Sequence, residues 1–219
     1  MHNSVQNYKD IVNSIDRKLE EKKINLAPKV IAVSKTFELE KILPLIEYGH
    51  QDFGENKVQE AIEKWTNIKL KKENIKLHLI GRLQSNKVKY AVKIFDYIHS
   101  VDSQKLAKKI AEEQQKIKKN IKLFIQVNIG NEDQKSGVQV DKINDLITFS
   151  RELKLDIIGL MCIPPANELP DKYFKEIKLL NKKFKLSELS MGMSSDYLKA
   201  VENSSTYLRI GSSIFGKRI

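Results

Sequence analysis

A lysine near the start of the chain follows a short apolar segment, and its amine could do covalent chemistry. Residues 30–33 are apolar and largely β-branched, and they lie between Pro28 and a polar turn that contains Lys35. This pattern predicts a buried strand that ends just before the lysine. An amine in that position is partly desolvated, which disfavours its charged form, and a neutral lysine amine can form a Schiff base with an aldehyde. A single lysine is more often a solvated surface residue, so this prediction needs support from elsewhere in the chain.

Two serine- and glycine-containing stretches near the end of the chain could bind an anion. They are residues 190–195 and 209–213, and each follows a predicted strand and precedes a predicted helix. Backbone N–H groups at helix starts, together with serine hydroxyls, form phosphate sites. For either stretch alone, helix capping by the serines is the better explanation. Phosphate binding becomes the favoured interpretation only if both stretches lie on neighbouring strands of one barrel.

Eight strand-like segments alternate with segments of helical periodicity, and this order must position the lysine and the serines. Strict alternation predicts a parallel sheet, and eight units predict a single (β/α)8 TIM barrel with an extra N-terminal helix over 5–22. We find no linker, so residues 1–219 are expected to form one domain. The predicted strands are 30–33, 50–56, 76–81, 97–101, 121–129, 155–161, 187–191 and 206–210. The later helices are 38–48, 58–70, 86–95, 103–119, 140–153, one that follows a loop with Pro170 and ends at Phe184, 195–203 and 212–215.

An open doubly wound sheet is the alternative to the barrel. No Gly-x-Gly-x-x-Gly sequence follows the first predicted strand, which disfavours a dinucleotide-binding fold. In a barrel, the residues after the strands lie at one mouth, so Lys35 would face the two serine-containing stretches. An aldehyde that carries a phosphate would satisfy both. Pyridoxal 5′-phosphate is such a molecule, and a sugar phosphate bound by a Schiff-base aldolase is another.

Composition excludes some classes of function. The chain has 219 residues, a net charge of +11 and one cysteine, Cys162, so an intrachain disulfide is excluded and a cysteine-based metal site is not expected. No apolar segment is long enough for a membrane span, and the N-terminus lacks a signal pattern, so we expect a cytoplasmic protein. The positive charge could indicate a nucleic-acid partner, but the lysines are dispersed and no basic stretch contains interleaved aromatic residues.

Five motifs together resemble the pyridoxal-phosphate homeostasis proteins, whose barrel is of the alanine racemase N-terminal type. They occur in the order of that family and span essentially the whole chain. The motifs are Ala-Val-Ser-Lys-Thr at 32–36, Phe-Gly-Glu-Asn at 53–56, His-Leu-Ile-Gly-Arg-Leu-Gln-Ser-Asn-Lys at 78–87, Leu-Ser-Met-Gly-Met-Ser at 189–194 and Arg-Ile-Gly-Ser-Ser-Ile-Phe-Gly at 209–216.

The resemblance implies a role for six residues in binding pyridoxal 5′-phosphate. Lys35 would carry the cofactor as an internal aldimine, and Arg209 would face the pyridine nitrogen. The pocket would be completed by Asn56 at its wall and by the phosphate-holding residues Ser194, Gly211 and Ser212. No residue is assigned a catalytic role or a metal. Arg82 stands where the family usually has proline, and the family usually has a basic residue or proline near Phe37, but neither change touches the aldimine.

Several residues in these motifs have a structural interpretation as well. His78 lies inside a predicted strand and is expected to be a hydrogen-bonded core histidine. Asn56 could simply satisfy the turn after the second strand, and Met191 and Met193 are expected to pack the barrel floor.

The expected function is reversible carriage of the cofactor for vitamin B6 homeostasis, without robust turnover. Arg209 can donate a hydrogen bond to the ring nitrogen but cannot protonate it, which disfavours transaminase-like chemistry. Racemases of this fold, as the resemblance implies, supply a tyrosine from an added domain, whereas this sequence stops at Ile219. Apo-forms of pyridoxal-phosphate enzymes would be the partners, and a monomer is expected. The alternatives are a racemase-like enzyme for an unidentified amino acid and a basic nucleic-acid-binding protein.

Overall fold

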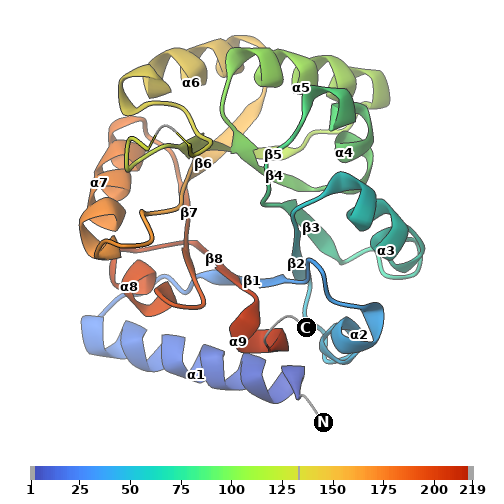
Figure 1. Cartoon of the computed structure of the whole chain (residues 1–219), viewed down its shortest axis with the longest axis vertical. Helices are drawn as coiled ribbons and strands as arrows, with labels where there is room; N and C mark the ends of the chain where they lie inside the picture. Colours follow the sequence, from blue (N-terminus) through green and yellow to red (C-terminus); the bar gives the residue numbers. More distant parts are fainter. Residues whose placement is uncertain (1–2, 133, 217–219) are drawn as a thin grey trace.

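Eight parallel strands form a closed barrel in which each strand pairs with its neighbours in sequence order and β8 pairs with β1 (Figure 1). The computed structural model describes residues 3–132 and 134–216. The strands are β1 (Lys29–Val33), β2 (Asp52–Glu55), β3 (Lys76–Leu79), β4 (Tyr97–Val101), β5 (Lys122–Val127), β6 (Asp156–Cys162), β7 (Glu188–Met193) and β8 (Tyr207–Ile210).

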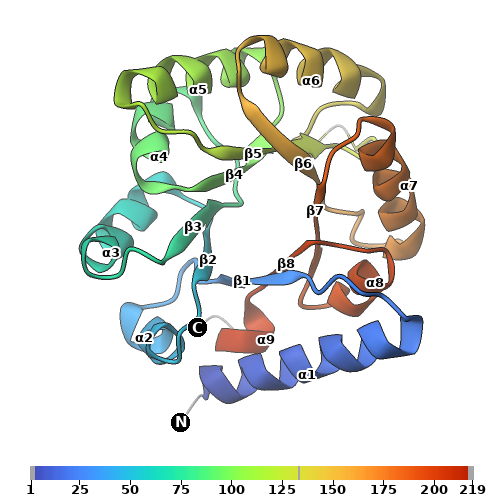
Figure 2. The same ribbon diagram turned by 180° about the vertical axis from the view of Figure 1, so that it is seen from behind.

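Helices surround the barrel and bury their apolar sides against the outer face of the sheet (Figures 1 and 2). They follow the strands in the order that the alternating pattern predicted, so the predicted (β/α)8 barrel is confirmed. The helices are α1 (Ser4–Lys22), α2 (Leu39–Glu47), α3 (Val58–Lys71), α4 (Val88–Ile94), α5 (Gln104–Ile117), α6 (Ile143–Glu152), α7 (Pro170–Lys183), α8 (Tyr197–Glu202) and α9 (Ser212–Phe215), with 3-10 turns at Ser85–Lys87 and Val140–Lys142.

The N-terminal helix α1 precedes the first strand, as predicted, and completes the helical ring. It lies beside α8 and α9, which are both short (Figures 1 and 2). Ile11, Ile15 and Leu19 form its buried side, and the side-chain amide of Asn7 donates to the carbonyl oxygen of Ile214 at 2.9 Å. The helix therefore covers apolar surface that the two short helices leave open.

The barrel interior is aromatic and polar. Tyr97, Tyr207 and Phe124 form a cluster separate from the larger core between sheet and helices. Two buried histidine rings stack within it, His78 on Tyr97 at a centroid distance of 4.3 Å and His99 on Phe124 at 4.2 Å. His78 is therefore a hydrogen-bonded core residue, as the sequence suggested.

Some predicted boundaries were wrong for local reasons. The helix after β7 begins at Tyr197 with Asp196 as its N-cap residue, and neither Ser194 nor Ser195 caps it. The Asp196 carboxylate instead accepts a hydrogen bond from the Met193 N–H at 2.6 Å. Helix α5 begins directly after Ser103, whose hydroxyl oxygen accepts a hydrogen bond from the Leu106 N–H. No helix in residues 3–132 and 134–216 is both long and apolar enough to cross a membrane.

The seam between β6 and β7 yields a test of barrel closure. A Cβ atom added at Gly159 would lie 2.0 Å from the carbonyl oxygen of Glu188 on the neighbouring strand. Gly159→Ala should therefore push the strands apart and lower the free energy of unfolding by about 3 kcal/mol. Urea unfolding followed by circular dichroism measures the change.

Ser187→Ala is the matched control at the same seam. Ser187 is exposed and makes only a 3.4 Å hydrogen bond to the carbonyl oxygen of Ile158. Its loss should change the free energy of unfolding by less than about 0.5 kcal/mol. Equal stabilities of the two variants would contradict the tight packing of this seam.

Candidate functional site

A pocket of about 520 Å³ opens at the carboxyl ends of the strands, and we call it the mouth pocket. All six residues predicted to bind a cofactor line it, although they come from four separate parts of the chain. Such convergence at the carboxyl ends of parallel strands is typical of functional sites in this barrel. The lining consists of Val33, Lys35, Asn56, Ile80, Ile163, Met193, Ser194, Ser195, Arg209, Gly211 and Ser212.

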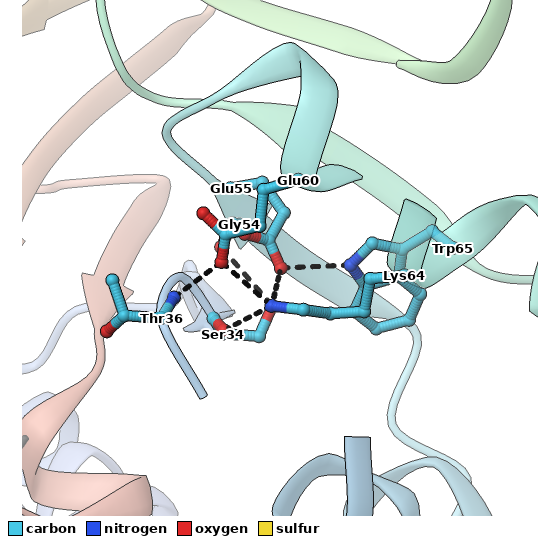
Figure 3. A network of polar contacts seen from close by, with 7 residues as sticks. All are labelled: Ser34, Thr36, Gly54, Glu55, Glu60, Lys64 and Trp65. Carbon is cyan, nitrogen blue, oxygen red and sulfur yellow. Dashed lines mark hydrogen bonds and ion pairs between the residues drawn. The ribbon is translucent and has the colours of Figure 1, made fainter. Parts of the chain in front are cut away.

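Lys35 lies two residues beyond the end of β1 and is half-buried. The residues on both sides of it are fixed by side chains of β2 and α3 (Figure 3). The Ser34 hydroxyl donates to a carboxylate oxygen of Glu55 at 2.8 Å, and the Thr36 N–H donates to a carboxylate oxygen of Glu60 at 2.5 Å. The backbone that carries the lysine is therefore held from two directions.

Lys64 joins the two carboxylates into one network. Its amine lies 3.1 Å from the Glu55 carboxylate and 3.0 Å from that of Glu60, and it also donates to the Ser34 carbonyl oxygen at 2.9 Å (Figure 3). The Trp65 indole donates to Glu55 at 2.9 Å. A buried carboxylate needs such partners, because an isolated charge in an apolar region is strongly destabilising.

The balance between burial and hydrogen bonding shifts the pKa values of the two glutamates in opposite directions. Glu55 is fully buried, and this burial raises the pKa of its carboxyl against the opposing effects of Lys64, Trp65 and Ser34. Glu60 is less buried, and hydrogen bonds from Thr36 and Lys64 outweigh burial and lower the pKa of its carboxyl. Glu60 is thus the firmer negative charge, and it holds the Thr36 N–H.

Thr36 adopts a strained backbone conformation beside the lysine. Its φ angle is +66°, in the left-handed region that a β-branched residue rarely occupies. The short hydrogen bond from its N–H to Glu60 compensates for that strain. The sharp turn at this point sends the chain from β1 to α2 directly after Lys35.

The serine-rich side of the mouth pocket brings together the ends of β7 and β8. The Ser194 hydroxyl oxygen lies 3.4 Å from the backbone nitrogens of both Gly211 and Ser213. These are long hydrogen bonds, so the hydroxyl and both N–H groups keep capacity for a stronger acceptor. Gly192 lies within β7 where the register with β8 shifts, and only glycine suits the position, since its φ is +92° and an added Cβ would lie 2.5 Å from the Ala200 Cβ.

Arg209 lies on β8 at the floor of the mouth pocket and is almost completely buried. Its guanidinium donates to the Ser190 hydroxyl oxygen at 2.7 Å and to the Cys162 carbonyl oxygen at 2.9 Å. Burial lowers the pKa of the guanidinium from its usual very high value. A guanidinium remains protonated in a protein, so Arg209 is a fixed cation and a hydrogen-bond donor.

A second pocket of about 320 Å³ adjoins the mouth pocket and shares Asn56, Ile80 and Ile163 with it. Arg82, the residue that stands where related sequences usually have proline, lines this second pocket. Lys135 lines it too, and its amine pairs with the Glu132 carboxylate at 2.5 Å. The other lining residues are Gly81, Gln126, Val127, Asn128, Gln134 and Ser136.

Comparison with known proteins identifies the family of this chain. Residues 9–218 match the family described as alanine racemase, N-terminal domain. A pyridoxal phosphate homeostasis protein of Pasteurella multocida is 36% identical, and the match covers 97% of this chain and 97% of that protein. The chain belongs to the pyridoxal phosphate homeostasis family.

Solved structures agree with this membership. PipY of Synechococcus elongatus, solved with PLP bound, has a TM-score of 0.80 and 33% identity, and the match covers 92% of this chain and all of PipY. An alanine racemase of Clostridium difficile has a TM-score of 0.72 and 16% identity, and the match covers 97% of this chain but 57% of that enzyme. The similarity to the alanine racemase shows only that the two folds are alike.

Some residues of the site in this member of the pyridoxal phosphate homeostasis family were not predicted from the sequence. Lys64 and Glu60 were treated as ordinary helix residues, although they hold the segment around Lys35. Lys135 lies in the polar loop after β5 and lines the second pocket. Because loops after the strands form the mouth of such a barrel, its position in the sequence could have identified it. Met191 is buried in the core as expected, whereas Met193 lines the mouth pocket and corrects that expectation.

The Lys64 network yields a stability prediction. Lys64→Met removes a cation that lies 3.1 Å from the buried Glu55 carboxylate. Breaking a buried pair leaves an uncompensated charge, so the free energy of unfolding should fall by about 3 kcal/mol. Urea unfolding near neutral pH gives the value.

A double variant separates loss of charge balance from loss of packing. Adding Glu55→Gln to Lys64→Met removes the uncompensated charge and should restore part of the stability. Lys57→Met, at an exposed lysine just before α3, should change stability by less than about 0.5 kcal/mol. If Lys64→Met were as stable as Lys57→Met, the network would not hold this segment.

Proposed function

We propose that the chain binds pyridoxal 5′-phosphate reversibly in the mouth pocket, buffers it and delivers it to apo-forms of enzymes that need it. The observation that carries this proposal is that one pocket collects a lysine, a buried arginine and three serines from β1, β7 and β8 and the segments that follow them. The name of the Pasteurella multocida relative and the PLP bound by PipY support it.

The donor set of the mouth pocket fits an anionic aldehyde. Its described lining contains two cations and several hydroxyl and N–H groups but no carboxylate, which suits a phosphate. In the proposal, Ser194, Gly211 and Ser212 hold the phosphate and Asn56 lines the wall. Lys35 would hold the cofactor through its amine, and the cofactor would supply the aldehyde for that reversible attachment.

Arg209 limits what the bound cofactor can do. The cofactor, when bound, supplies an aldehyde and an electron-withdrawing ring. In the proposal, Arg209 donates a hydrogen bond to the ring nitrogen without giving up its proton, so the ring stays unprotonated and is a poorer electron sink. The Ser190 and Cys162 contacts keep the guanidinium in place for this role.

The lining of the two adjoining pockets favours a carrier over a racemase. Racemisation needs a second acid or base opposite the lysine amine. Among the described residues that line either pocket there is no tyrosine, histidine, cysteine, aspartate or glutamate. The remaining ionisable candidate is Lys135, whose amine is engaged by Glu132 and by the Pro164 carbonyl oxygen.

The proposal also covers the oligomeric state of the protein, its compartment and its partners. We take the protein to act as a monomer, since one chain supplies all six of the residues assigned to the cofactor. We place it in the cytoplasm, where a buried and unpaired Cys162 is the ordinary form of cysteine. Its partners would then be the cofactor-dependent enzymes of the same compartment.

Borohydride trapping tests the assignment of Lys35. Protein loaded with pyridoxal 5′-phosphate should show an absorption band that borohydride abolishes, and mass spectrometry should find the reduced adduct on Lys35. Lys35→Ala should lack the adduct, while Lys57→Ala, at an exposed lysine nearby, should keep it. Absence of cofactor uptake by the wild type, or an adduct mainly at another lysine, would overturn the proposal.

Turnover measurements test the assignment as a carrier. The loaded protein, mixed with each of the common amino acids, should racemise or decarboxylate none of them at typical enzyme rates of ~1–10³ per second. Chiral chromatography and carbon dioxide release report the two reactions. A rate in that range for any amino acid would establish an enzyme and reject the carrier function.

A further inference from the structure

A chain of hydrogen bonds crosses the barrel interior and ends at Arg209. Asp52 Oδ1 lies 2.9 Å from His78 Nε2, and His78 Nδ1 lies 3.0 Å from His99 Nε2. His99 Nδ1 lies 2.8 Å from the Ser190 hydroxyl oxygen, which accepts from Arg209 Nη1 at 2.7 Å. We call these five residues the interior chain. It connects the start of β2 with the floor of the mouth pocket.

When Asp52 is ionised, the hydrogen bonds of the interior chain can point in only one direction. Each residue then donates to the next, from Arg209 at one end to the Asp52 carboxylate at the other. Arg209 can only donate, so the Ser190 oxygen accepts from it, and the hydroxyl hydrogen of Ser190 points to His99 Nδ1. A neutral His99 then carries its hydrogen on Nε2 and donates it to Nδ1 of His78. His78 in turn carries its hydrogen on Nε2 and donates it to the Asp52 carboxylate.

The opposite direction would leave a buried hydrogen without a partner. If His99 Nδ1 donated to Ser190, the hydroxyl oxygen would accept two hydrogen bonds, and its own hydrogen would lack a recorded acceptor among the described residues. His78 Nε2 would then be an acceptor, and Asp52 would have to carry a proton to face it. Such an unsatisfied buried group destabilises a structure, because its interaction with water is lost and not replaced.

Burial keeps both histidines neutral, as this direction requires. Both rings are completely buried, and burial lowers the pKa of each. The Asp52 hydrogen bond opposes this effect at His78, whereas at His99 the neighbouring His78 and Arg209 add to it and the pKa lies well below its usual value. Stacking on Tyr97 and Phe124 fixes the two rings so that their nitrogens cannot easily exchange partners.

The far end of the interior chain reaches solvent. The Asp52 side chain is 19% exposed and lines a separate pocket at the opposite end of the barrel, together with Tyr8, Asp16, Lys29 and His50. Burial raises the pKa of the Asp52 carboxyl, but the His78 hydrogen bond and nearby positive charge outweigh burial and lower that pKa overall. Asp52 is therefore a carboxylate near neutral pH.

We propose that Asp52 is a positioning residue for the mouth pocket although it lies at the other end of the barrel. Its carboxylate fixes the direction of the interior chain, and Ser190 thereby holds the Arg209 guanidinium with its remaining N–H groups available to the pocket. The benefit to a bound pyridine nitrogen rests on the proposed function. The direction of the chain does not rest on it and can be measured without cofactor.

Nitrogen NMR of the cofactor-free protein tests the direction. The sequence has four histidines, so single substitutions assign their ring signals. His78 and His99 should both be neutral with hydrogen on Nε2 and a bare Nδ1 from pH 8 down to pH 6. A protonated Nδ1 on either ring in this range would overturn the proposal, whether or not the protein binds cofactor.

Cofactor affinity tests the positioning role. Asp52→Asn should weaken binding of pyridoxal 5′-phosphate by about 3- to 30-fold and shift its absorption band, as expected for a contact relayed through a network. Asp16→Asn is the matched control, because Asp16 lines the same far pocket without joining the interior chain. Equal affinity of the two variants would reject the positioning role.

A double-mutant cycle shows whether the effect travels through Ser190. Ser190→Ala interrupts the chain between His99 and Arg209, so adding Asp52→Asn to it should weaken binding no further. Additive losses would mean that Asp52 acts by another route and would contradict the proposal. Should the wild type fail to bind the cofactor, the proposed function fails, and the NMR result still decides the direction of the chain.

Discussion

Pairing of β1 with β8 is the constraint on which the site depends. Ala32 on β1 lies in register with Ile210 on β8 and with Phe53 on β2. Because all strands are parallel, the segments that follow these residues emerge together at one edge. Lys35, Asn56 and Gly211 therefore share a pocket that no local sequence pattern contains. The barrel acts as a fixed frame, and the lining of the pocket consists of residues at the ends of the strands, such as Arg209, and of residues that directly follow them.

The frame and the pocket were predictable from sequence because they follow from periodicity and strand order. Apolar segments such as 30–33 gave the strands, and the rule that parallel strands share a mouth placed Lys35 opposite the serine-rich stretches. Ser190 shows the limit of this approach. It belongs to one of those stretches, yet it lies inside the barrel on β7 and accepts from Arg209. Only the strand register decides which hydroxyls face the pocket.

Side-chain networks were not predictable, because they join residues that share no local pattern. Lys64 on α3 reaches back to the segment before Lys35, and the partners of Asp52 lie on β3 and beyond. On a helix, a lysine four residues after Glu60 is an ordinary surface pair. In the structure the same pair is largely removed from solvent and fixes a strained turn. Burial, which decides the difference, is a property of the whole fold.

The N-terminal helix has a consequence for how the chain folds as it is made. The apolar side of α1, formed by Ile11, Ile15 and Leu19, packs beside α8 and α9, and Asn7 bonds to a residue 207 positions later. Helix α1 precedes α8 and α9 in the sequence, so its contacts with them form only after the residues of both helices have been made. Until then, the side of α1 that packs beside them and the edge of β1 that pairs with β8 stay exposed, a state that favours aggregation and binding by chaperones.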